Sequence, residues 1–360
     1  MTCALGRASI RSVPLITDVE QIAAIFREAG RRRAALPTIC TENREATEAI
    51  FEGIARAARR HGIARPPLVI AFTAHYPGRS NLLRYTSRWD MREGFLAARD
   101  DILRLSRPDG PYGHLQVVVH LDHGQPQQDG EVLEWGRGLI GSLMFDATSL
   151  PLAENIEATA AFVRERGGDF FVEGAVDEVM EASGAVTGRL TSPEEAERYL
   201  KQTGCRLICI NVGTEHRAPA AGRARYRGEL ARSIGERVGP VLCLHGSSSL
   251  SADEFGRLAD DGIVKVNIWT ALERVGGQAI ARDAIEQADS ILPGEELTCL
   301  ARAGLLGPRM TERAKAARPV LDLLTHTHRR NEVWSPTVTR LVEGYCEALG
   351  FARLAGGLFS

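Results

Sequence analysis

The chain has 360 residues, of which 44% are hydrophobic and 25% are charged, as in an ordinary globular protein. Its net charge of −2 gives no electrostatic reason to bind nucleic acid, and no apolar run approaches the roughly 18–20 residues that span a membrane. The N-terminus has no sustained apolar core of a signal peptide, so we expect a cytoplasmic protein. The seven cysteines include no Cys-x-x-Cys pair, and we expect them to be reduced.

The first predicted element is a helix over 15–35, which has Asp18 as its N-cap and should close the floor of the fold. Short apolar runs followed by glycine or small polar residues then alternate with helical patterns, as is typical of buried parallel strands. The predicted strands cover 35–43, 66–78, 115–124, 139–149, 169–176, 206–213, 240–246 and 261–270. The predicted helices cover 44–61, 89–105, 151–168 and 228–238, with two more that begin at 191–195 and after Ser251, and 79–88 is irregular.

Eight strand-then-helix units predict an α/β protein with a parallel TIM (β/α)8 barrel. A doubly wound open sheet is the alternative, but it would more often carry a glycine-rich phosphate-binding turn, and no G-x-G-x-x-G follows the first strand. We place the barrel in residues 1–290 and a C-terminal helical extension, packed on the barrel, in 291–360. Helical patterns in this extension cover 297–304, 312–324 and 336–349.

Three histidines, His123, His216 and His245, lie at or just past the carboxyl ends of predicted strands, in VVVHLDHG, LICINVGTEH and VLCLHGSSS. A barrel of this kind keeps its active site at that end. One such histidine would more often be a packed core or loop residue. Three imidazoles from separate strands can instead converge on one metal and leave further positions open, as at a catalytic zinc. We therefore predict a metal-dependent enzyme.

The lysines support a metal rather than an imine. A carbanion beside a carbonyl is commonly stabilised either by a lysine imine or by a Lewis-acid metal. Only three lysines occur: Lys201 in a predicted helix, Lys315 in the extension and Lys265 on the last strand. Lys265 lies two residues before Asn267, deeper on the same inward face, where we expect a buried salt bridge.

The ordered motifs HLDHG, GSLMFDATSLPLAENIEAT, VEG, GTEH, LHGSSS and VKVNIWT resemble class II fructose-bisphosphate/tagatose-bisphosphate aldolases over about residues 15–285. The resemblance implies a carbon–carbon lyase that deprotonates dihydroxyacetone phosphate, or a similar ketose donor, and stabilises the enediolate on zinc. It implies one catalytic Zn²⁺, allows a monovalent cation as well, and implies a homodimer or homotetramer. The expected partner is a small ketose or sugar phosphate, with no nucleic acid or membrane.

The resemblance also assigns residue roles. It makes His123, His216 and His245 the zinc ligands, places Asp146 at a secondary metal position, and has Asp122 polarise or protonate the carbonyl oxygen at the new bond. The loop after the fifth strand is where this family keeps a mobile proton-transferring glutamate, for which Glu181 is our first candidate and Glu178 our second. The donor and its phosphate are expected at Thr73, Arg217, Gly246, Ser247, Ser248, Asn267, Trp269 and Thr270.

Several positions depart from the family pattern. Ala175 replaces the second glutamate of V-E-x-E-L-G, which should weaken or relocate the buried metal position. Arg217 replaces a glycine and could add a bidentate contact to phosphate or carboxylate. Ser247 replaces the second glycine of H-G-G-S, and Trp269 should narrow or cap the pocket. We therefore expect a retained metal-enolate mechanism with an altered substrate.

Two alternatives to an aldolase remain open. One is a catalytically altered aldolase-like subunit that acts as a structural or regulatory partner, which the loss of the strand-five glutamate favours and the intact histidines oppose. The other is an epimerase or isomerase that uses the same metal-enolate chemistry.

Overall fold

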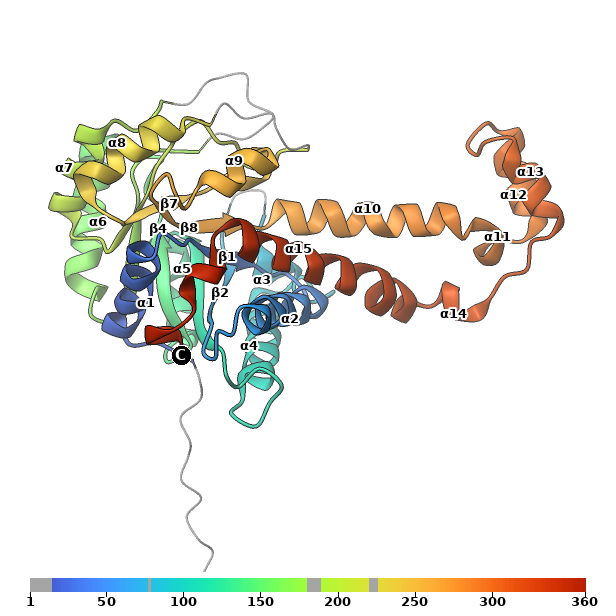
Figure 1. Ribbon diagram of the computed structural model, residues 1–360, viewed down its shortest axis with the longest axis horizontal. Coiled ribbons are helices and arrows are strands. Elements are labelled where there is room, and N and C mark those ends of the chain that lie inside the picture. The colour runs from blue at the N-terminus through green and yellow to red at the C-terminus, as the bar shows by residue number, and fades with distance from the viewer. Residues whose placement is uncertain (1–14, 77–78, 180–188, 220–225) are drawn as a thin grey trace, which may run out of the picture.

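The computed structural model describes residues 15–76, 79–179, 189–219 and 226–360. Eight parallel strands close into a barrel in sequence order, so the predicted TIM barrel is confirmed (Figure 1). The strands are β1 (Leu36–Cys40), β2 (Pro67–Thr73), β3 (Gln116–Gly124), β4 (Ile140–Phe145), β5 (Phe171–Ala175), β6 (Leu207–Cys209), β7 (Leu242–Leu244) and β8 (Ile263–Ile268). No helix in these described ranges is long and apolar enough to cross a membrane.

The helices of the barrel mostly begin where the sequence signals predict. Asp18 caps α1, and Ser192 and Ser251 form capping boxes with Glu195 and Glu254. The helices are α1 (Val19–Arg31), α2 (Arg44–Arg60), α3 (Asn81–Arg84), α4 (Met91–Ser106), α5 (Pro126–Trp135), α6 (Leu152–Arg166), α7 (Pro193–Thr203), α8 (Gly228–Val238), α9 (Ala252–Arg257) and α10 (Thr270–Glu286). Three helices were not predicted from the sequence: α5, α10 and the short α3, which lies in the segment predicted to be irregular.

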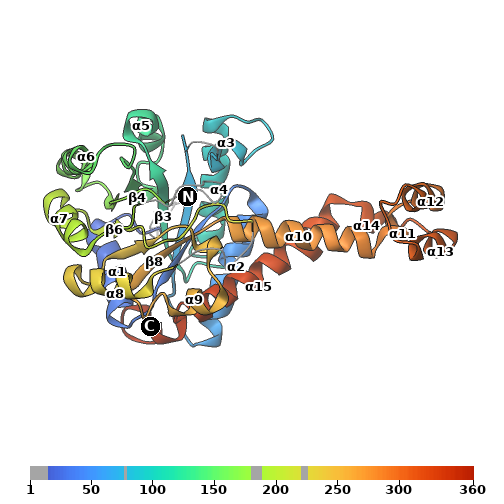
Figure 2. The same cartoon turned by 90° about the horizontal axis from the view of Figure 1, so that it is seen from above.

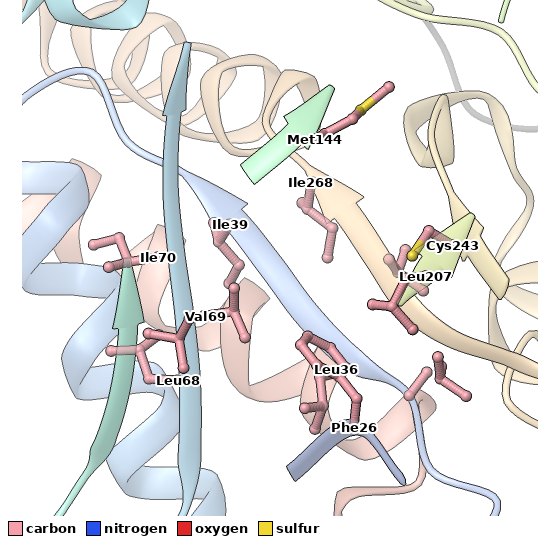
Figure 3. Packing of buried hydrophobic residues seen from close by; sticks show 14 of the residues in the cluster. Phe26, Leu36, Ile39, Leu68, Val69, Ile70, Met144, Leu207, Cys243 and Ile268 are labelled. Carbon is pink, nitrogen blue, oxygen red and sulfur yellow. The ribbon is translucent and has the colours of Figure 1, made fainter. Parts of the chain in front are cut away.

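The core fills the barrel and the layer between strands and helices. All eight strands are buried along their whole length, which explains why they appear in the sequence as continuous apolar runs. Helix α1 packs across the lower end, where Phe26 stacks on Phe171 with ring centroids 5.4 Å apart. Figure 3 shows Phe26 beside Leu36 at this end of the core. With the floor closed, only the carboxyl ends of the strands can form an open site.

The C-terminal region has two parts. Helix α10 leads away from the barrel to an arm with its own small apolar cluster, which includes Leu297 and Met310 (Figures 1 and 2). The arm comprises α11 (Ala288–Ile291), α12 (Gly294–Arg302), α13 (Arg309–Lys315) and α14 (Leu321–Leu324). The π-helical turn η2 (His328–Trp334) and α15 (Ser335–Ala348) then return, and α15 packs on α2 and α10. The chain ends in the short 3-10 turns η3 (Phe351–Leu354) and η4 (Gly357–Phe359).

One helix of the extension differs from the prediction. The pattern over 312–324 predicts a single helix, but α13 ends at Lys315 and α14 starts only at Leu321. The cause is Pro319, which has no backbone N–H to donate and restricts the residue before it to extended conformations.

Candidate active site

The structure brings three histidines together at the open end of the barrel. His123 is the second-last residue of β3, His216 lies in the loop after β6, and His245 directly follows β7. Their potential ligand atoms all lie within 4.8 Å of one another. The ring centroids are separated by 4.8 to 5.7 Å. His123 and His216 are 93 positions apart in the chain, and His216 and His245 are 29 positions apart, yet all three lie in one small volume.

The imidazole of His123 is held from two sides. Its Nδ1 lies 2.7 Å from Asp146 Oδ2, and the ring of Tyr76 stacks on it at 4.2 Å between centroids. Asp146 is itself fixed, because its Oδ1 accepts hydrogen bonds from the backbone N–H and the hydroxyl of Thr148. His123 has a φ of 49°, in the left-handed region that non-glycine residues rarely adopt. The hydrogen bond between Asp146 and His123 orients the imidazole, in addition to the metal-binding role that the sequence predicts for Asp146.

The three imidazoles fit a divalent cation. Burial lowers the pKa of His216 well below its usual value and also lowers that of His245, so both are neutral, as metal ligands must be. Burial opposes a charge on His123 too, but Asp122 and Asp146 outweigh it and raise the pKa of His123. His245 Nε2 is buried and has no hydrogen-bond partner in the described part of the chain. The site thus offers two neutral imidazoles, His216 and His245, beside a third, His123, whose positive charge the nearby carboxylates favour.

Asp122 lies beside the histidines as a carboxylate. Its Oδ1 accepts a hydrogen bond of 2.7 Å from Asn267 Nδ2, and its Oδ2 accepts one of 3.3 Å from Cys40 Sγ. Burial alone would raise the pKa of Asp122, but His123, His245 and Lys265 outweigh it and hold that pKa well below its usual range. Asp122 is therefore ionised in the resting site.

Three buried side chains, Glu173, Lys265 and Asn267, form a row of polar contacts that leads to Asp122. Lys265 Nζ lies 2.8 Å from Glu173 Oε2, which is the salt bridge that the sequence predicts, and it donates to Asn267 Oδ1 at 2.6 Å. Burial disfavours both charges, yet the pair raises the pKa of Lys265 and lowers that of Glu173 to about 2. A lysine kept charged in this way is a poor imine-forming amine. Asn267 connects it to Asp122.

A pocket opens above these groups and touches all three histidines. It is lined by every residue that the sequence predicts to bind substrate: Thr73, Arg217, Gly246, Ser247, Ser248, Asn267, Trp269 and Thr270. Cys40, Tyr76, Arg79 and Asn81 also line the pocket and were not predicted from the sequence. Arg79 is ion-paired with Glu42 and lies over the ring of Trp269, with its Cζ 4.0 Å from the centroid. These two side chains form one wall of the pocket.

The turn after β7 is built tightly against the loop after β6. Gly246 has a φ of 70°, and a Cβ there would lie 2.7 Å from the backbone nitrogen of Glu215, so only glycine fits. Ser247 Oγ donates to the carbonyl of Asn267 at 2.6 Å, and Thr214 Oγ1 donates to the carbonyl of His245 at 2.7 Å. These two hydrogen bonds fix the position of His245 relative to β8 and to the loop after β6.

A second pocket also touches the three histidines. Its lining includes Asp146, Ala175, Glu178 and Arg217. Glu178 is an exposed residue that lines this pocket, whereas Glu181 lies outside the described residues. His75, in the loop after β2, pairs with Asp129 through its Nδ1 at 2.7 Å.

Glu273, in the first turn of α10, provides a test of the electrostatics beside the first pocket. Burial and the nearby Glu42 raise its pKa to about 7. Because the folded-state pKa lies above the unfolded value, the stability contributed by the protonated carboxyl is present at low pH and is lost as the pH rises through about 7. Allowing for partial exposure, the ionised form costs about 2 kcal/mol.

We therefore expect Glu273→Gln to raise the free energy of unfolding by about 2 kcal/mol at pH 8, and by much less at pH 5. Urea denaturation at the two pH values measures this difference. Glu286→Gln, an exposed position at the other end of α10, is the control and should show no such dependence on pH. An equal effect of Glu273→Gln at both pH values would contradict the raised pKa.

With the site described, the chain can be compared with known proteins. The sequence model of the class II fructose-bisphosphate aldolase family matches residues 20–318. The chain belongs to this family. The resemblance seen in the motifs is therefore confirmed, and the membership supports an aldolase, a carbon–carbon lyase that acts on a small molecule.

Solved aldolase structures show the same fold. The YdjI aldolase from Escherichia coli K12 is 19% identical, with a TM-score of 0.59, over 91% of this chain and 96% of that one. The fructose-bisphosphate aldolase (Fba) from Campylobacter jejuni is 15% identical, with a TM-score of 0.68, over 94% of this chain and 96% of that one. At these identities the similarity concerns the fold.

The positions that the sequence predicts to differ from the family motifs gather around the histidines. Arg217, Ser247 and Trp269 line the first pocket, and Ala175 lines the second. Arg217 keeps a φ of 51°, a left-handed conformation in which a glycine would be unstrained. The departures therefore change the walls of the pockets while the histidines stay in place.

Proposed function

We propose that the protein is a metal-dependent aldolase that makes or cleaves a carbon–carbon bond in a ketose or sugar phosphate, with dihydroxyacetone phosphate or a similar ketose as the donor. The observation that supports this most is the convergence of three imidazoles beside an ionised aspartate in a pocket at the open end of the barrel. Held by His123, His216 and His245, a Zn²⁺ ion would supply Lewis-acid charge next to the donor carbonyl.

Asp122 is the proposed acid–base group at the reacting bond. In the cleavage direction its carboxylate accepts the proton of the hydroxyl group whose carbon loses the carbon–carbon bond. In the condensation direction the same proton returns to the carbonyl oxygen of the aldehyde. Asn267 and Cys40 hold the two carboxylate oxygens in place for both directions. Glu178, or Glu181, is the proposed base that removes the proton beside the donor carbonyl.

The phosphate of the substrate is proposed to bind near Arg217 and the first turn of α10. The pocket is lined there by Thr270, the first residue of this 17-residue helix, whose N-terminal N–H groups favour anions. Arg79, on the wall formed with Trp269, presents a guanidinium there that is paired with Glu42. The indole of Trp269 narrows the pocket, which supports a substrate other than the usual bisphosphate.

We also propose that the enzyme is a homodimer or homotetramer. The end of α10 and the arm expose large apolar side chains that a monomer would leave in water: Ile285, Leu305, Val320, Leu321 and Leu324. Apolar residues gathered in this way are typical of protein–protein interfaces.

The test is a retro-aldol assay of the purified protein. We expect one bound Zn²⁺ per chain and release of a triose phosphate from at least one substrate in a panel that begins with fructose and tagatose bisphosphates. A chelator should lower cleavage by more than ~100-fold, and Zn²⁺ should restore it. Exchange of solvent deuterium into the substrate without cleavage would indicate the epimerase or isomerase instead. If the protein bound no metal and catalysed no exchange, the result would indicate the structural or regulatory subunit.

A further inference from the structure

The residues that line the first pocket come from two sides that meet at Asp122. One side follows β6, β7 and β8 and includes Arg217 and Thr270, where the substrate phosphate is proposed to bind. The other, the β1–β2 side, consists of Cys40, Thr73, Tyr76, Arg79 and Asn81. Asp122 contacts both sides, since it accepts hydrogen bonds from Asn267 of β8 and Cys40 of β1. A ketose with its phosphate on the first side and its reacting bond at Asp122 therefore extends toward the β1–β2 side.

The positive charge on the β1–β2 side is already compensated. Among the residues of this side, Arg79 is the cation, and its Nε donates to Glu42 Oε2 at 2.9 Å while its Nη2 pairs with Oε1 of the same carboxylate. Glu42 is buried, and Asn81 Nδ2 also donates to its Oε2, at 3.2 Å. A bidentate pair of this kind satisfies the planar guanidinium geometrically as well as electrically. The pair therefore brings no net charge to this end of the pocket.

A second carboxyl group lies close to this ion pair. Glu273, in the first turn of α10, has its pKa raised by burial and by Glu42, while Arg79 acts in the opposite direction. The effect of Glu42 is the larger of these two electrostatic effects, so Glu273 experiences the pair as negative on balance. A phosphate group placed on the β1–β2 side would meet two carboxyl groups and one guanidinium that is already paired. Burying an anion without a compensating cation is unfavourable.

The remaining surface of the β1–β2 side suits an uncharged sugar chain. The hydroxyl of Thr73 donates to Asn81 Oδ1 at 3.0 Å, so both side chains are held in place as neutral polar groups. The indole of Trp269 adds an apolar face, with Arg79 Cζ 4.0 Å from its centroid. Neutral polar groups beside an aromatic ring match the hydroxyl groups and C–H bonds of a polyhydroxylated chain.

We propose that the substrate is a ketose 1-phosphate whose aldehyde half is an uncharged polyhydroxyaldehyde bound on the β1–β2 side. Glu42 is then a specificity-determining residue, because it cancels the charge of Arg79 and so disfavours an aldehyde half that carries a second phosphate. Cleavage breaks one carbon–carbon bond, Asp122 accepts the hydroxyl proton of the aldehyde half, and the donor half takes up one proton to leave as dihydroxyacetone phosphate. This inference rests on the proposed aldolase function and narrows its substrate class.

The test measures binding of two probes that cannot be cleaved because they have no carbonyl group. The probes are a hexitol 1-phosphate and the matching hexitol 1,6-bisphosphate, which differ only in the second phosphate. Calorimetric titration of the full-length protein should show that the monophosphate binds at least ~10-fold more tightly, since like charges placed together oppose binding. Equal or tighter binding of the bisphosphate would overturn the proposal, and so would a failure of both probes to bind.

Glu42→Gln tests the origin of the preference. It removes the carboxylate charge but keeps an oxygen to which Arg79 can donate, so the bisphosphate should bind at least ~10-fold more tightly than to the wild type and the monophosphate should change by less than ~3-fold. Glu45→Gln is the matched control, because it removes one charge nearby but faces Arg330, and it should change neither affinity. An equal effect of the two variants would overturn the role of Glu42. If Glu42→Gln does not fold, the wild-type comparison of the two probes still decides.

The outcome is separable from that of the proposed function. Cleavage of fructose 1-phosphate and of fructose 1,6-bisphosphate is measured beside the binding of the two probes. A preference for the monophosphate probe in a protein that cleaves no ketose phosphate would support the uncharged β1–β2 side and count against the aldolase. A higher kcat/KM for the bisphosphate would support the aldolase and overturn the narrower substrate class.

Discussion

Replacing His216 with alanine is expected to lower kcat/KM for carbon–carbon cleavage by more than about 10³-fold, which corresponds to about 4 kcal/mol of transition-state stabilisation. The variant removes one of the three imidazoles that converge at the mouth of the barrel. Its backbone lies in the loop after β6 and outside any strand, so the barrel should stay folded. Steady-state cleavage rates with added Zn²⁺, together with circular dichroism, measure the two effects.

His75→Ala is the matched control for this variant. His75 also lies in a loop at the open end of the barrel, but it pairs with Asp129 and does not belong to the group of three imidazoles. Its replacement should change kcat/KM by less than ~10-fold, in the range of surface substitutions. If the two variants lost activity equally, or if His216→Ala kept wild-type rates, the three histidines could not form the catalytic centre.

The second large effect is expected for Asp122→Asn. This change keeps the size and shape of the side chain but removes its proton-accepting oxygen, so kcat should fall by about 10²–10⁴-fold, the usual contribution of a general acid–base group. KM and the zinc content should change little, since the three imidazoles are untouched. A parallel assay of rate and metal content separates this result from loss of the metal.

Cys40→Ala is the control for Asp122→Asn. It removes only the 3.3 Å hydrogen bond to Asp122 Oδ2 and leaves the one from Asn267 in place. We expect a loss of less than ~10-fold, because one weak thiol donor contributes little. A wild-type kcat in Asp122→Asn would assign the proton transfer to another group. A loss of zinc in that variant would make Asp122 part of the metal site.

Local patterns in the sequence were sufficient to predict the barrel and the candidate metal ligands. Each strand is buried on both faces, so it leaves a short apolar run that can be recognised without its neighbours. The alternation of side chains along a strand places Lys265 below Asn267, and the buried ion pair with Glu173 follows that rule. Helix α5 was missed because its sequence, PQQDGEVLEW, is mostly polar and buries few apolar side chains such as Val132 and Leu133.

The contacts that tune the site could not be predicted in this way. Cys40 meets Asp122 from a strand 82 positions away. Arg79 lies over Trp269 although the segment around it has no regular pattern. Asp146 holds His123 by a hydrogen bond that depends on the relative height of β3 and β4, whose register shifts within this pair. Such contacts are set by the closure of the barrel.

The sequence by itself determined the number and order of the strands, the end of the barrel that carries the site, and the residue types available there. These properties depend on hydrophobic periodicity and turn chemistry, which act within a few residues of the chain. Only the tertiary structure decided which side chains meet: the histidines with one another, Asp122 with Asn267 and Cys40, and Glu173 with Lys265. The reason is geometric, because a closed barrel places neighbouring strand ends a few ångströms apart whatever their separation in sequence.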